Sequence, residues 1–172
     1  MSDGTRADPP RAIHNPVTGV VIREPTDDRE GAEVVLRPGA TGPAAHVHPE
    51  VEERFEVLAG EPTFTVDGRE RRLSPGADIW VSPGTPHAFA NESTVPARIR
   101  VRTRPESERL GEVVAPLFGL AVEGETDADG RPHPLQAAVM AEATLDQTYF
   151  ADVPYRVQRA FGDLLGPVGR SL

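Results

Sequence analysis

Short apolar stretches separated by turn residues fill the first 104 positions of the chain. Within most of them apolar and polar residues alternate, which is the period of a strand with one buried face. This pattern predicts strands over residues 19–23, 32–37, 54–58, 63–66, 69–73, 78–81 and 98–104. Turns recur about every 8 to 15 residues, a spacing that favours a sandwich or barrel.

From residue 105 the period becomes helical. The first predicted helix has an apolar face of Leu110, Val113, Val114 and Leu117, and Pro116 is expected to kink or end it. A second helix is expected from Pro134 to about residue 143. Asp152 and Pro154 are start signals for a third helix, whose predicted apolar stripe is Val157, Phe161, Leu164 and Leu165.

These patterns divide the chain into three parts. Residues 1–11 are expected to be a flexible tail, residues 12–104 a single β-barrel or jelly roll, and residues 105–172 a helical extension. The fold class is therefore mainly β. The extension is expected to pack on the barrel, to cover its mouth, or to lie at a dimer interface.

Composition excludes several kinds of chemistry. The chain has no Cys, and all 18 basic residues are Arg, so thiolate and lysine chemistry are impossible. A net charge of −9 disfavours nucleic acid as a partner. Apolar runs are too short to span a membrane, and the polar N-terminus has no signal core, so the cytoplasm is the expected location. The 16 glycines and 18 prolines are explained by tight turns, as at Asp67-Gly68.

The clearest chemical resource is a set of histidines and one glutamate. His46 and His48 are separated by one residue, which puts both imidazoles on the same face of a strand. Glu53 begins the next strand, and His87 follows the turn at Ser82-Pro83-Gly84. Three imidazoles and a carboxylate suit a divalent transition metal, although a His-x-His pair alone is also common as a solvated surface feature.

The spacing of these residues resembles the two motifs of the cupin family. Residues 42–60 match the first motif, with His46-x-His48, four residues, Glu53, six residues and Gly60. Residues 76–91 match the second, with Gly76, five residues, Ser82-Pro83-Gly84, two residues, His87, three residues and Asn91. The departures are Ser82 where a proline is usual, and Gly42, which stands two residues closer to His46 than usual.

This resemblance implies a small barrel with one metal near its mouth. The implied ligands are His46, His48, Glu53 and His87, and the metal would be Fe, Mn, Ni, Cu, Co or Zn, with no organic cofactor. If Glu53 points inward, strand alternation places Phe55 and Val57 inward and Arg54 and Glu56 outward. Phe55, Val57 and Phe89 are then expected either to line a substrate pocket or simply to fill the core.

Cupins include both enzymes and binding proteins, so the resemblance leaves the function open. We expect a metal-dependent enzyme acting on a small organic molecule, with dioxygenase as the leading subclass. The alternatives are an isomerase, lyase or cyclase, and a non-catalytic binding or regulatory protein. The expected partners are a small molecule and a second copy of the chain.

Other polar residues have weaker claims to a function. Four arginines share one face of the last predicted strand: Arg98, Arg100, Arg102 and Arg104. They are expected to be a solvated or edge-protecting face, although one of them could reach the barrel mouth and hold a carboxylate. Tyr149 and Tyr155 are expected to pack, and His14 and His133 to lie on the surface.

Overall fold

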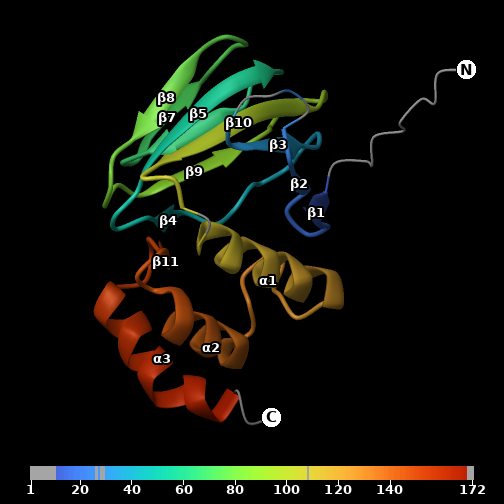
Figure 1. Ribbon diagram of the computed structural model, residues 1–172. Coiled ribbons are helices and arrows are strands. Elements are labelled where there is room, and N and C mark those ends of the chain that lie inside the picture. Colours follow the sequence, from blue (N-terminus) through green and yellow to red (C-terminus); the bar gives the residue numbers. More distant parts are fainter. Residues whose placement is uncertain (1–10, 26, 28–29, 108, 170–172) are drawn as a thin grey trace, which may run out of the picture.

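The computed structural model describes residues 11–25, 27, 30–107 and 109–169. Two antiparallel sheets face each other, and three helices lie together at one end of them (Figure 1). The expected flexible tail at residues 1–11 lies outside the described residues, apart from Arg11.

All strand pairs in both sheets are antiparallel. The first sheet has the order β1 (Ala12–Asn15), β2 (Val20–Arg23), β3 (Ala32–Leu36), β10 (Ala97–Arg104), β5 (Glu52–Ala59) and β8 (Asp78–Val81). The second sheet has the order β11 (Tyr149–Phe150), β4 (His46–Val47), β9 (His87–Ala90), β6 (Thr63–Val66) and β7 (Arg69–Arg72). The mainly β prediction is confirmed, and this arrangement of sheets is consistent with a jelly roll.

The core lies between the two sheets. Alternation along β5 buries Glu53, Phe55 and Val57 and leaves Arg54 and Glu56 half-buried, as the sequence pattern predicts. The ring of Phe55 lies 5.4 Å from that of Phe64 and 5.6 Å from that of Phe89, both on the second sheet. These aromatic contacts join the sheets beneath the end that carries the histidines.

The hairpin between β6 and β7 has the turn that its sequence predicts. Asp67 and Gly68 both have positive φ, at 50° and 71°, so the two-residue connection matches a type I′ turn. The ladder from Thr63 opposite Arg72 to Val66 opposite Arg69 is continuous through this turn.

The helical extension consists of α1 (Arg109–Glu123), α2 (Pro134–Thr144) and α3 (Tyr155–Gly169). All three expected helices are present. Pro116 was expected to kink or end α1, and it does not end the helix, which continues to Glu123. None of the helices in the described part of the chain combines the length and apolar character needed to cross a bilayer.

The packing face of α3 differs only in part from the predicted stripe, because Phe161 and Leu165 are half-buried. Val157 and Leu164 are 56% and 73% exposed. Instead, Gly162 and Gly166 are buried against α2, and a Cβ at Gly162 would lie 2.8 Å from the backbone nitrogen of Glu142. Because glycine has no side chain, the two helices approach so closely at these positions that an apolar side chain would not fit. A search of the sequence for large apolar residues does not detect this kind of contact.

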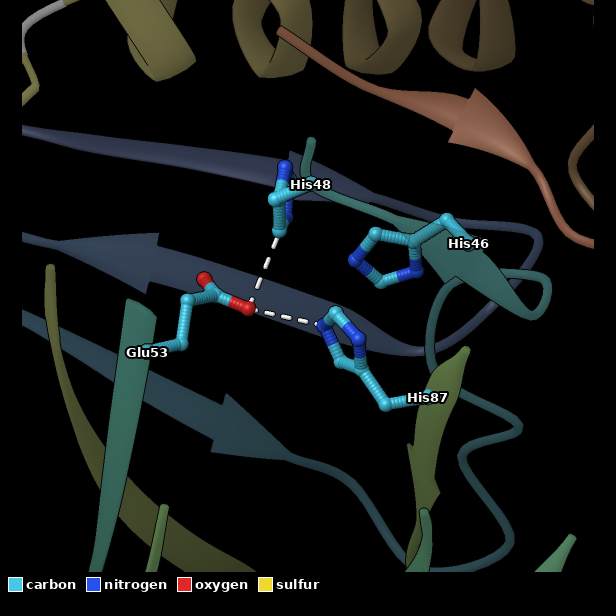
Figure 2. Close-up of side chains that lie close together, drawn as sticks. All are labelled: His46, His48, Glu53 and His87. Carbon is cyan, nitrogen blue, oxygen red and sulfur yellow. Dashed lines mark hydrogen bonds and ion pairs between the residues drawn. The ribbon is translucent and has the colours of Figure 1, made fainter. Parts of the chain in front are cut away.

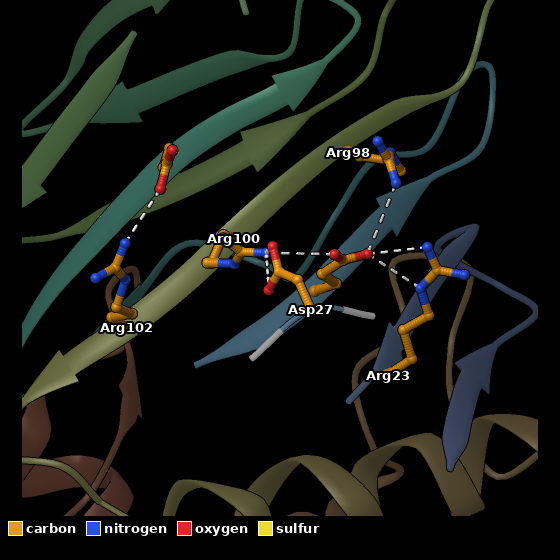
Figure 3. A network of polar contacts seen from close by, with 7 residues as sticks. Arg23, Asp27, Arg98, Arg100 and Arg102 are labelled. Carbon is orange, nitrogen blue, oxygen red and sulfur yellow. Dashed lines mark hydrogen bonds and ion pairs between the residues drawn. The ribbon is translucent and has the colours of Figure 1, made fainter. Parts of the chain in front are cut away.

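The arginine strand is also placed differently from the expectation. β10 lies between β3 and β5 and is therefore not an edge strand. Arg100 is 1% exposed, and its guanidinium lies 2.8 Å from Asp27 and 3.5 Å from Glu33 (Figure 3). The solvated-face interpretation is therefore wrong for Arg100, because the side chain is buried and its guanidinium forms an ion pair with Asp27.

Candidate metal centre

Three separate parts of the β domain bring the histidines and the glutamate together. His46 on β4 is the register partner of His87 on β9, and His48 directly follows β4. Glu53 reaches the same place from β5 of the facing sheet (Figure 2). The cluster therefore lies between the sheets, at the end nearest the helices.

The side chains converge closely. The Oε2 atom of Glu53 lies 2.7 Å from Nε2 of His87 and 3.5 Å from Nε2 of His48. The ring of His46 lies 4.3 Å from that of His87 and 4.9 Å from that of His48. One donor atom from each of the four residues lies within 4.8 Å of the other three. This cluster could hold a metal ion.

The hydrogen bonds on the far side of each ring support that assignment. The Nδ1 atoms of His46, His48 and His87 lie 2.9, 2.8 and 3.0 Å from the backbone carbonyl oxygens of Ala44, Gln147 and Thr85. A carbonyl can only accept, so each Nδ1 carries a hydrogen, and the Nε2 atoms of His46 and His48 keep their lone pairs. Metal-binding imidazoles are commonly held in this way, so the residues fit a metal.

The protonation states also fit. Burial, together with the neighbouring His87 and His48, lowers the pKa of His46 to about 3, and burial also lowers the pKa of His48. Burial acts to raise the pKa of Glu53, but the hydrogen bond from His87 and the nearby imidazoles outweigh it, and the pKa falls below its ordinary value. At neutral pH, His46 and His48 are thus neutral and Glu53 is ionised, the forms that bind a cation.

The helical extension contributes directly to the surroundings of the cluster. Its short strand β11 pairs with β4, with Tyr149 opposite Val47 and Phe150 opposite His46. Gln147, two residues before β11, supplies the backbone carbonyl that accepts the hydrogen bond from His48. The sequence pattern of the extension is helical and gives no sign of this strand.

The side chain of Gln158 on α3 holds the outer edge of β11. Its Oε1 accepts from the backbone nitrogen of Phe150 at 3.1 Å, and its Nε2 donates to the carbonyls of Phe150 at 2.8 Å and Val153 at 2.7 Å. Gln158 therefore pairs with β11 as a neighbouring strand would. β11 is held from both sides, by β4 and by α3.

A cavity of about 970 Å³ adjoins the cluster and extends to the helices. His46, His48 and Glu53 line it together with Phe55 and Phe89. Val57 is not among its lining residues, because it lies further along β5 and packs within the core. Arg102, Arg104 and Tyr149 also line the cavity, whereas His14 and His133 are exposed, as expected.

Trp80 also lines this cavity, and sequence reasoning did not single it out. It is 44% exposed, with the guanidinium of Arg54 5.3 Å and that of Arg104 5.1 Å from its ring. Its position on β8, opposite Arg54, places it on the outward face. The signal available in the sequence was a large aromatic residue at an outward-facing position of a predicted strand.

Comparison with known proteins agrees with this architecture. Residues 32–101 match the family model described as "Cupin domain". This region is therefore a cupin domain, and it contains all four residues of the candidate metal centre. The implied resemblance to cupins is confirmed.

Several solved structures are similar to parts of this chain. A sugar phosphate isomerase of the cupin superfamily from Silicibacter pomeroyi is 25% identical, with 51% of this chain and 60% of that chain covered and a TM-score of 0.45. A predicted oxalate decarboxylase from Thermotoga maritima is 21% identical, with 59% and 96% covered and a TM-score of 0.47. A DMSP lyase from Ruegeria pomeroyi is 29% identical, with 49% and 37% covered and a TM-score of 0.37. The chain thus spans about three fifths of the Silicibacter protein and less than half of the Ruegeria protein, and no curated protein sequence matches it.

Proposed function

We propose that the protein is a metal-dependent enzyme acting on a small organic molecule, and that its reaction is a dioxygenation, in which both atoms of O₂ enter the product. The observation that carries this proposal is the meeting of three imidazoles and one carboxylate in one cluster, of which His46, His48 and Glu53 line a large cavity. Such a combination of an oriented donor set and a pocket is typical of an active site.

The residues have distinct roles in this proposal. His46, His48, Glu53 and His87 would hold one divalent transition metal, which when bound supplies Lewis acidity or the activation of O₂. The carbonyls of Ala44, Gln147 and Thr85 hold the imidazoles in the binding tautomer. Phe55 and Phe89 provide an apolar wall beside the cluster, which excludes water from the reacting substrate.

A measurement of metal content and O₂ uptake tests the proposal. We expect freshly purified protein to contain one transition metal per chain and to consume O₂ in the presence of a phenolic or enolic substrate. The variant His87→Ala should lose both properties, whereas His14→Ala, on the exposed β1, should keep them.

The other outcomes distinguish the alternatives. Conversion of substrate without O₂ uptake would contradict a dioxygenase and favour an isomerase, lyase or cyclase. Reversible ligand binding without turnover would favour a binding or regulatory protein. Metal-free protein that cannot be loaded with any divalent transition metal would contradict the metalloenzyme itself.

A further inference from the structure

The cavity is built by two different parts of the chain. Phe55, Phe89 and three of the candidate metal ligands, His46, His48 and Glu53, line it from the cupin domain, and the helical extension completes it. Side chains on the helical side include Val114 and Leu117 from α1, Ala137 and Met140 from α2, and Val157 and Phe161 from α3. All six are apolar, and they come from three helices that follow the β domain in the sequence.

These helical side chains are only partly buried by the protein itself. Val157 is 56% exposed, and Val114, Leu117, Ala137 and Met140 keep part of their surface accessible. Water that fills such a space lies against apolar groups, and its release favours the binding of any apolar molecule that fits. A volume of about 970 Å³ lies at the upper end of the range for sites that enclose small organic ligands.

Polar side chains near the helical side of the cavity already form ion pairs or hydrogen bonds within the protein. Arg131 at the cavity wall forms a two-pronged ion pair with Asp152, at 3.1 and 2.7 Å, and stacks over the ring of Phe150. Gln158 is committed to the backbone of β11. On the helical side the cavity therefore offers chiefly apolar surface, whereas the β domain contributes polar groups, namely the candidate metal centre, Arg102 and Arg104.

We infer that the substrate is a predominantly apolar organic molecule with a polar, oxygen-bearing end. The polar end lies at the cluster of His46, His48 and Glu53, and the apolar body lies against α1, α2 and α3. This assignment rests on the proposed function, because it takes the metal end as the reacting end. It gives the helical extension the role of a substrate-binding wall.

Two homologous series of probes test this inference. Alkyl hydroxamates from acetohydroxamate to octanohydroxamate, titrated into metal-loaded protein, carry a metal-binding group and a tail of increasing length. Each added methylene should tighten binding about fourfold until the cavity is filled, which corresponds to about 0.8 kcal/mol per buried CH₂. Primary alcohols from butanol to octanol, titrated into metal-free protein, should show the same trend with weaker binding.

Substitutions within α2 locate the binding surface. Ala137→Phe fills part of the cavity and should abolish the gain from longer tails while leaving acetohydroxamate binding unchanged. Ala143→Phe on the same helix is the matched control, because Ala143 is exposed and lies outside the lining. Met140→Gln, which keeps the side-chain length, should reduce the gain in affinity per methylene. It serves as the second test where Ala137→Phe does not fold.

The outcomes separate the two proposals. An affinity that does not change with tail length, in both series, would overturn the apolar-substrate inference even where the metal binds. A tail-length dependence for the alcohols in a protein that binds no metal would support the apolar site and contradict the proposed metalloenzyme. Equal effects of Ala137→Phe and Ala143→Phe would also overturn the inference, because they would place the tail elsewhere.

Discussion

The imidazole of His48 donates its Nδ1 hydrogen to the carbonyl oxygen of Gln147, 2.8 Å away and 99 residues later in the chain. This hydrogen bond ties the candidate metal centre to the helical extension. It orients Nε2 of His48 toward Glu53, so the extension takes part in building the site that the cupin domain contains.

Substitution of Gln158 tests this dependence. Gln158→Leu removes three hydrogen bonds from the backbone around β11, which should lower the free energy of unfolding by about 1 to 3 kcal/mol. Because β11 adjoins the residue that orients His48, we also expect metal affinity to fall about tenfold. Thermal denaturation and metal titration measure the two effects.

A nearby glutamine provides the control for that variant. Gln147→Ala keeps the carbonyl that accepts from His48 and loses only a side-chain contact with Asp146. It should leave metal affinity unchanged. Equal metal affinity in Gln158→Leu and the unmodified protein would show that the extension does not position the metal centre.

Two glycines with similar backbone conformations allow a steric comparison. Gly42 and Gly39 have φ of 67° and 73°, so alanine at either is strained by about 1 kcal/mol. A Cβ at Gly42 would also overlap the carbonyl oxygen of Phe89, whereas nothing lies near one at Gly39. We expect Gly42→Ala to cost at least about 4 kcal/mol of stability. Denaturant unfolding of the two variants with equal losses would refute this reading of the close approach.

The ion pair of Arg131 and Asp152 makes stability depend on pH. The hydrogen bond from Arg131 lowers the pKa of Asp152 below 3.8, so its contribution is present at neutral pH and is lost as the pH falls through the lowered value. Because Asp152 is about half exposed, Asp152→Asn should cost less than about 1 kcal/mol at pH 7. Unfolding of both proteins at pH 7 and pH 2 should show a smaller difference at pH 2, and a difference as large at pH 2 as at pH 7 would contradict it.

The resemblance of two short sequence motifs to those of cupins predicted the residues of the candidate metal centre. His46 and His48 share a strand face, and Glu53 and His87 stand at fixed distances within two short motifs. Alternation along the strand predicted that Phe55 and Val57 both point inward. In the structure Phe55 lines the cavity, whereas Val57 lies deeper and does not. The expected homodimer stays a prediction.

Long-range contacts could not be predicted in the same way. β11 has only two residues, so it carries no period, and its pairing with β4 spans about a hundred residues. The acceptor at Gln147 is a backbone carbonyl, which any residue would supply. Alternation along β10 identified the face that carries Arg100, but not the connection that covers it.

The most direct test of the account is a calorimetric titration of metal-free protein with a divalent transition metal. We predict one ion per chain, with binding lost in His87→Ala and in Glu53→Gln and retained in His14→Ala. The absence of binding for Fe, Mn, Ni, Cu, Co and Zn, or equal binding in all three variants, would contradict a metal centre at His46, His48, Glu53 and His87.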